Sequence, residues 1–230
     1  MTTKSKYIFL FTLSFLVMVN CSQSSKGTTP EKNNYVFFLH NQFLEDNDIT
    51  AQHPEYGRAE YNEIINSFKQ EGFAVISEKR KAKTNVKEYA QKVASQIESL
   101  LKKGVKPDHI TIIGTSKGGY IAQYVSTFIA NPNLNFVFIG SFQESDIENF
   151  PEINFCGNIL TIYDKSDTFG VSAIRRKETS KLKINKFVEV ELDTKLKHGF
   201  LYKPLKEWLE PSKMWAKRNY NLEINKEPKA

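Results

Sequence analysis

The stretch from Ile110 to Ala122 constrains the fold more than any other part of the chain. It joins a β-branched apolar run to a helical pattern through Gly-Thr-Ser-Lys-Gly-Gly. So short a connection requires a very tight turn, and glycines at 114 and 118 remove the collisions that side chains would make there. Such a turn holds Ser116 in a strained backbone with its hydroxyl exposed, next to the free N–H groups of the helix. Gly-x-Ser-x-Gly between a strand and a helix is typical of a nucleophilic serine, whereas a glycine-rich turn with an incidental serine is the structural alternative.

Apolar runs and amphipathic helical patterns alternate along the rest of the chain. Strands are expected at residues 35–40, 73–76, 110–113, 136–140, 159–163 and 187–192. Helices are expected at residues 57–72, 84–101 with Thr84 as the cap, 117–129, 171–182 and 199–209. Nearly continuous apolar runs are typical of strands buried on both faces, and strand–helix alternation requires right-handed parallel crossovers. We therefore expect an α/β fold of about six mostly parallel strands flanked by helices.

Two features refine this fold. The run 187–192 alternates apolar and polar residues, which predicts an edge strand, and residues 41–56 are expected to form a long polar loop. The folded domain is expected at 35–210, with the last helix ending near Pro211. No structure is predicted for the tail 211–230 from its sequence.

The N-terminus has the pattern of a targeting segment over residues 1–20. Lys4 and Lys6 precede an apolar run that is too short to span a bilayer but suits a signal-peptide core. The run ends at Cys21, and the junction resembles a bacterial lipoprotein signal, although Asn20 is unusual at its position. We expect lipidation of Cys21, a flexible tether over 21–34 and a membrane anchor in the bacterial cell envelope, facing the periplasm or the outside. Ordinary secretion is the alternative.

The net charge and the cysteine content limit the classes of partner, disulfide and metal site that are expected. The formal net charge is +6, and removal of Lys4 and Lys6 with the leader would leave +4, spread along the chain without a basic block. This gives little support for a nucleic-acid partner. The only other cysteine is Cys156, so the mature domain is expected to have no internal disulfide, and no metal-binding spacing occurs. No cofactor and no obligate protein partner are expected.

Chemistry in an open parallel sheet collects beyond the carboxyl ends of its strands. Those loops here contain His40, Ser116, Asp164 with Asp167, and His198. A serine hydroxyl needs a base to accept its proton, and histidine is suited to that role near neutral pH. The histidine in turn needs an acceptor for its other nitrogen. We predict a site of Ser116, Asp167 and His198.

Several assignments keep alternatives. Asp164 or Glu144 could be the acid in place of Asp167, which could instead cap a helix. His198 could be a solvent-facing cap, and His40 and His53 are expected to structure their loops. The Lys117 ammonium could attract an anionic substrate or simply be solvated.

With these residues in place, the segment from Tyr35 to Leu209 resembles the α/β-hydrolase family. The resemblance implies that the six strands correspond to the family's third to eighth and that no large lid is present. It also implies an oxyanion hole formed by the N–H of Lys117 and an N–H of the loop after the first strand. Many relatives have His-Gly in that loop. Here Asn41 stands in the glycine's place, as a residue that can adopt unusual backbone angles, and Gln42 is the second candidate.

A narrower resemblance comes from the run that starts at His53, from Ile-Ser-Glu-Lys-Arg at 76–80 and from Thr-Ser-Lys-Gly-Gly at 115–119. These segments resemble a bacterial group of proteins classed as hydrolases. The resemblance implies a serine hydrolase that cleaves an acyl bond of a small-molecule substrate, by default a carboxylic ester, through an acyl-enzyme. Thioesters and amides remain open. A hydrolase-fold binding lipoprotein without turnover is the main alternative, and a phosphate-binding domain lacks the glycine-rich motifs it would need.

Overall fold

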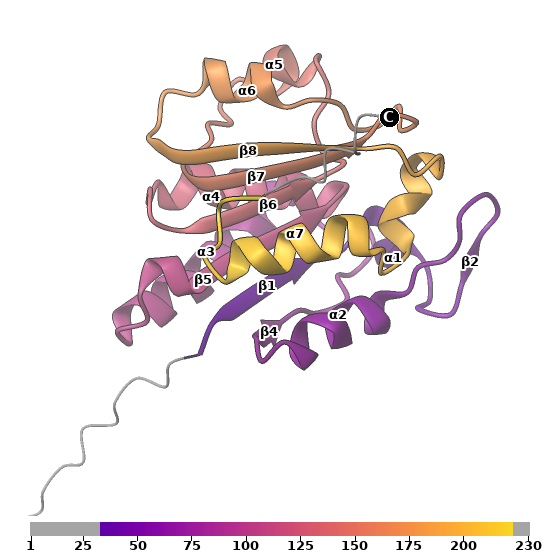
Figure 1. Cartoon of the computed structure of the whole chain (residues 1–230), viewed down its shortest axis with the longest axis horizontal. Coiled ribbons are helices and arrows are strands. Elements are labelled where there is room, and N and C mark those ends of the chain that lie inside the picture. Colours follow the sequence, from indigo (N-terminus) through magenta and orange to yellow (C-terminus); the bar gives the residue numbers. More distant parts are fainter. Residues whose placement is uncertain (1–32, 223–230) are drawn as a thin grey trace, which may run out of the picture.

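A computed structural model describes residues 33–222 of the chain. Its main sheet has the order β4-β1-β5-β6-β7-β8, and every neighbouring pair in it is parallel. The strands are β1 (Tyr35–Leu39), β4 (Ala74–Ile76), β5 (Ile110–Thr115), β6 (Asn135–Ile139), β7 (Gly157–Asp164) and β8 (Ile184–Leu192). The predicted six-stranded α/β fold is confirmed, and β8 lies at the predicted edge (Figure 1).

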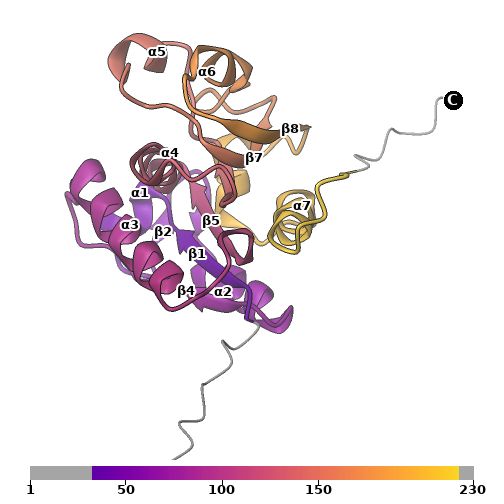
Figure 2. The same cartoon turned by 90° about the vertical axis from the view of Figure 1, so that its left-hand side faces the viewer.

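Helices cover both faces of the sheet. Figure 2 shows α3 and α4 on one face and α2 and α7 on the other. The helices are α1 (Gln42–Asp46), α2 (Tyr61–Gln70), α3 (Val86–Lys102), α4 (Lys117–Ile129), α5 (Asp146–Asn149), α6 (Ile174–Thr179) and α7 (Lys206–Ala216), with 3-10 turns η1 (Pro107–His109) and η2 (Lys197–Tyr202). Between β6 and β7 the chain forms only the short α5, so this connection contains no large lid.

Strand β1 shows why the apolar runs are continuous. Val36 and Phe38 belong to the hydrophobic cluster beneath α2 and α7, whereas Phe37 and Leu39 belong to the cluster beneath α3 and α4. Successive side chains of a strand point to opposite faces, so a strand covered on both faces is apolar at every position. This burial positions the carboxyl ends of the strands, where the candidate site lies.

The loop between β1 and α2 is more structured than the sequence indicated. The expected polar loop at 41–56 contains α1, and a small antiparallel hairpin pairs β2 (Gln52–His53) with β3 (Gly57–Arg58). The predicted cap of α3 is also wrong by one residue. Asn85 is the N-cap, because its side chain accepts the N–H groups of Lys87 and Glu88.

The end of the chain differs most from the expectation. The predicted helix 199–209 is replaced by η2 and then by α7, which continues through Pro211 to Ala216. Trp208 and Trp215 are both fully buried against the sheet. Burial of two tryptophans outweighs the hydrogen bond that proline removes from a helix. Part of the segment after residue 210 is therefore packed on the domain.

Candidate active site

Ser116 occupies a strained turn between β5 and α4. Its backbone has φ +51° and ψ −123°, a left-handed φ that is unfavourable for a residue with a Cβ. The surrounding backbone packs tightly: a Cβ on Gly114 would overlap the Gly118 carbonyl, and one on Gly118 would overlap the Leu39 carbonyl. The predicted role of the two glycines is thus confirmed. Gly119, which the sequence did not single out, is equally crowded, because a Cβ there would overlap Ser141.

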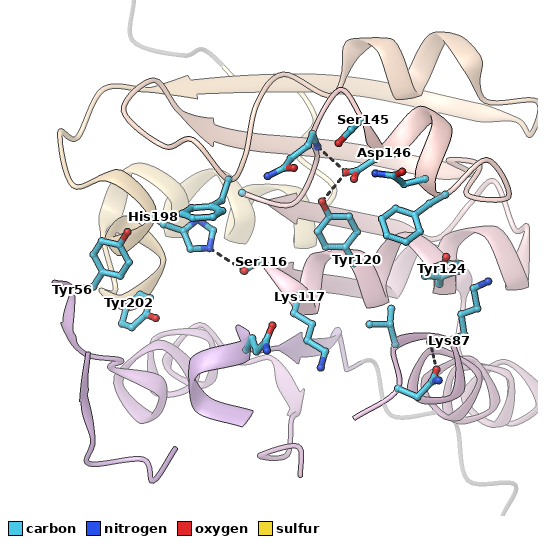
Figure 3. Close-up of a pocket in the computed structure, with 18 of the residues that line it drawn as sticks. Tyr56, Lys87, Ser116, Lys117, Tyr120, Tyr124, Ser145, Asp146, His198 and Tyr202 are labelled. Carbon is cyan, nitrogen blue, oxygen red and sulfur yellow. Dashed lines mark hydrogen bonds between the residues drawn. The ribbon is translucent and has the colours of Figure 1, made fainter. Parts of the chain in front are cut away.

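The structure brings the three predicted site residues into one hydrogen-bonded chain. Ser116 Oγ lies 2.9 Å from His198 Nε2 (Figure 3), and His198 Nδ1 lies 2.7 Å from Asp167 Oδ2. The Asp167 side chain is completely buried and that of His198 is 12% exposed. A histidine held on one side by a buried carboxylate presents its other nitrogen to the hydroxyl as a proton acceptor.

The other two acid candidates lie elsewhere. Asp164 accepts hydrogen bonds from the backbone and side chains of Ser166 and Thr194, which fix the loops after β7 and β8. Burial raises the pKa of Asp164, but these hydrogen bonds outweigh burial and hold the pKa below its usual value. Glu144 forms an exposed ion pair with Arg175. Neither carboxylate is hydrogen-bonded to His198.

One predicted oxyanion donor is placed differently from the expectation. Asn41 has an extended backbone, φ −69° and ψ 174°, and its side chain accepts the N–H of Leu44 as the N-cap of α1. It therefore does not adopt the left-handed conformation expected for a glycine substitute. Gln42, the second candidate, is the first residue of α1, and Lys117 is the first residue of α4. Both residues line the cleft. First-turn N–H groups have no acceptor within their own helix.

The Lys117 ammonium is paired with a carboxylate and is mostly buried, with 17% of the side chain exposed. It lies 2.5 Å from a carboxylate oxygen of Glu45, whose side chain is completely buried. The other oxygen of Glu45 accepts from Arg80 Nε at 3.2 Å, and the Arg80 side chain is also completely buried. The sequence did not reveal this network, because no local pattern links residues so far apart in the chain.

The histidines at 40 and 53 structure their loops, as predicted. His40 Nε2 accepts the backbone N–H of Arg80 at 2.8 Å. Burial, and then the charge of Arg80, lower the pKa of His40 to about 3, so its ring is neutral at pH 7. His53 Nδ1 accepts the N–H groups of Glu55 and Tyr56, and its ring stacks on Tyr56.

A cleft of about 1150 Å³ opens beside Ser116 and His198. Figure 3 shows Tyr56 and Tyr202 at the end near His198, and Tyr124 and Lys87 at the far end. Its walls also carry the Tyr120 hydroxyl, which donates to Asp146 at 2.7 Å. Six aromatic side chains line it: Tyr56, Tyr120, Tyr124, Phe150, Phe169 and Tyr202. The sequence assigned these residues only to helices and loops, so the cleft walls are new information from the structure.

A parallel sheet covered by helices, with a strained serine on the turn between a central strand and the next helix, is the arrangement of the α/β-hydrolase fold. Within residues 33–222, no helix has the length and apolar character needed to cross a membrane. The same part of the chain contains no group of His, Cys, Asp and Glu side chains arranged to hold a metal ion.

Comparisons with known proteins agree with this fold. The profile of the uncharacterised protein family UPF0227 matches residues 58–140, which include Ser116 and less than half of the chain. No curated protein sequence gives a match. SOBER1 of Arabidopsis thaliana has a similar structure, with a TM-score of 0.53 and 16% identity over 81% of this chain and 99% of that one.

Two bacterial structures are also similar. ATU1826 of Agrobacterium tumefaciens, provisionally classed as an α/β hydrolase, gives a TM-score of 0.55 and 16% identity over 87% of this chain and 91% of that one. Esterase B of Lactobacillus rhamnosis gives a TM-score of 0.56 and 12% identity over 82% of this chain and 78% of that one. These structural likenesses show that the chain has the α/β-hydrolase fold.

Proposed function

We propose that the protein is a serine hydrolase that cleaves a carboxylic ester through an acyl-enzyme. Ser116 Oγ attacks the acyl carbonyl while His198 Nε2 accepts the hydroxyl proton. The N–H groups of Lys117 and Gln42 donate to the oxyanion of the tetrahedral intermediate. His198 then returns its proton to the leaving alcohol, and water attacks the acyl-enzyme with His198 again as the base. Asp167 orients His198 and stabilises its imidazolium form.

One observation carries this proposal: the chain of two hydrogen bonds from Ser116 through His198 to Asp167. A solvent-facing histidine cap would not need a completely buried carboxylate behind it. The positive φ of Ser116 adds support, because strain of this kind persists only where the surroundings impose it. Thioesters and amides would be cleaved by the same three residues. The cleft therefore decides which type of acyl substrate binds and is cleaved.

A fluorophosphonate probe tests the proposal, because it reacts with a serine hydroxyl that a histidine activates. We expect the wild-type protein to be labelled and Ser116→Ala to remain unlabelled. Ser145→Ala is the matched control, since Ser145 lines the same cleft outside the hydrogen-bonded chain, and its labelling should match wild type. Equal labelling of wild type and Ser116→Ala would contradict the proposal. An unlabelled, inactive wild type that binds an ester would favour a binding protein.

We further propose that the domain is anchored to an envelope membrane through lipidated Cys21, a residue that lies outside the described part of the chain. The cleft lies at the carboxyl ends of the strands, whereas β1 starts at Tyr35 at the opposite edge. The tether would therefore join the domain at the edge of the sheet opposite to the cleft. Labelled palmitate should be incorporated into wild type and Cys156→Ser but not into Cys21→Ser; incorporation into Cys21→Ser would refute the anchor.

A further inference from the structure

A buried network of side chains lies behind the candidate oxyanion hole. Glu45 in α1 contacts three groups from distant parts of the chain: the Lys117 ammonium at 2.5 Å, Arg80 Nε at 3.2 Å and the N–H of Thr84 at 2.8 Å. Glu45 and Arg80 have completely buried side chains, and that of Lys117 is 17% exposed. Burying charges is costly, and such pairs rarely add net stability compared with apolar residues. Their position next to the site indicates a functional reason for them.

The network controls the orientation of one peptide group. The carbonyl oxygen of Asn41 accepts from His40 Nδ1 at 2.7 Å and from Arg80 Nη2 at 3.3 Å. His40 Nδ1 is the donor, because its Nε2 already accepts a backbone N–H and the ring is neutral. The Asn41–Gln42 peptide is trans, so its N–H points opposite to its carbonyl. Because His40 and Arg80 hold the carbonyl, the Gln42 N–H points away from these two side chains, and Gln42 itself lines the cleft.

The same network joins this peptide to the turn that carries Ser116. Arg80 Nη2 also donates to the His40 carbonyl at 2.5 Å. Gly118 packs directly against the Leu39 and His40 carbonyls, where any Cβ would overlap them. Glu45 ties the side chain of Lys117 to the helix that Gln42 begins. The N–H groups of Gln42 and Lys117 would hold an oxyanion. The Glu45 carboxylate thus bridges the two segments to which these N–H groups belong.

We propose that Glu45, Arg80 and His40 are positioning residues that fix the Gln42 and Lys117 N–H groups as the two halves of the oxyanion hole. This inference rests on the proposed function, since an oxyanion forms only if Ser116 attacks an acyl group. Glu45 and Arg80 do not line the cleft, and neither side chain is hydrogen-bonded to Ser116. They act through the direction of two backbone donors, which stabilise charge that develops only in the transition state.

Amide resonances of the ¹⁵N-labelled protein report on these donors directly. In the free protein, Glu45→Gln and Arg80→Lys should each move the Gln42 resonance, and Glu45→Gln should also move that of Lys117. Glu71→Gln is the matched control, because it removes a carboxylate that pairs with Lys213 and Lys217 at the surface. An unmoved Gln42 resonance in both network variants would overturn the inference, whether or not the protein hydrolyses an ester.

A boronic acid and steady-state kinetics test the consequence for the reaction. An alkyl boronic acid that forms a tetrahedral adduct on Ser116 should shift both amides downfield in wild type, and only Lys117 in Arg80→Lys. With a nitrophenyl ester, Glu45→Gln and Arg80→Lys should lower kcat by about 10- to 100-fold, less than complete loss of a donor, while KM changes little. Arg80→Lys retains the charge, so it serves if Glu45→Gln does not fold.

The outcomes separate the two proposals. If wild type forms no adduct and no product, the proposed hydrolase function fails, while the amide shifts of the free protein still decide whether the network positions the loop. If wild type is active and both network variants keep kcat within twofold, the positioning role fails and the hydrolase function stands.

Discussion

Replacement of Asp167 by asparagine should reverse the proton arrangement of the site. Asp167 Oδ1 accepts the N–H of Phe169 at 2.8 Å, and Oδ2 contacts His198 Nδ1 at 2.7 Å. In Asp167→Asn, the amide oxygen keeps the Phe169 N–H, so the amide nitrogen faces His198 as a donor. His198 Nδ1 must then accept, its proton moves to Nε2, and the nitrogen next to Ser116 can no longer act as a base.

The size of the effect follows from the charge that is lost. Two opposite charges about 4 Å apart interact by about 4 kcal/mol at an effective dielectric constant of about 20, the value suited to protein sites. At about 1.4 kcal/mol for each tenfold change in rate, this is about 10³-fold in kcat. The wrong tautomer adds to it, so we expect a loss of about 10³- to 10⁴-fold in all.

The assay is hydrolysis of p-nitrophenyl acetate, followed by released nitrophenolate, with a thermal melt to verify folding. Glu144→Gln is the matched control, because Glu144 pairs with exposed Arg175 and not with His198; its kcat should stay within twofold of wild type. A folded Asp167→Asn with kcat within tenfold of wild type, or an equal loss of activity in Glu144→Gln, would rule out this role of Asp167.

Three other substitutions or titrations test separate parts of the structure. Gly118→Ala should abolish probe labelling and lower Tm, because its Cβ would overlap the Leu39 carbonyl. In the control Gly72→Ala the new Cβ meets no atom within 4 Å, and the positive φ should lower the free energy of unfolding by only about 1 kcal/mol. Labelling of Gly118→Ala at the wild-type rate would contradict the packing. Trp215→Ala should lower the free energy of unfolding in urea by about 3–5 kcal/mol, because the side chain is fully buried, and a loss under 1 kcal/mol would contradict this burial. Burial and Arg80 lower the pKa of His40 to about 3, so the unfolded state binds a proton at higher pH than the folded state does. The free energy of unfolding should therefore fall as pH drops from about 6.5 towards 3, by at most about 1.4 kcal/mol per pH unit from this residue. An NMR titration of His40 with a midpoint above 5 would refute this prediction.

The sheet was predictable because burial on both faces leaves a direct trace in the sequence. Five of the six strands contain a continuous apolar run, whereas β8 alternates as an edge strand does. Gly114 and Gly118 mark a backbone contact that admits no side chain. Since parallel strands bring their carboxyl ends to one edge, the topology was enough to bring Ser116, Asp167 and His198 together. The choice between Asp167 and Asp164 required coordinates, because both lie at the carboxyl end of the same strand.

Other features depend on contacts between distant residues. The helix through Pro211 exists because Trp208 and Trp215 are buried on the sheet, and a local rule stops the helix at the proline. Glu45 and Arg80 are ordinary charged residues in the sequence, and only the fold brings them together out of solvent. The wrong expectation for Asn41 has the same origin, because its role as an N-cap depends on α1, a helix of five residues.

Acyl transfer to Ser116 can be detected by mass spectrometry of the protein quenched during turnover of a nitrophenyl ester. We expect the mass of the protein to increase by that of the acyl group, with the modification on the peptide that contains Ser116 and absent from Ser116→Ala. Ester hydrolysis by wild type without an adduct on that peptide, or an adduct of equal yield in Ser116→Ala, would contradict it.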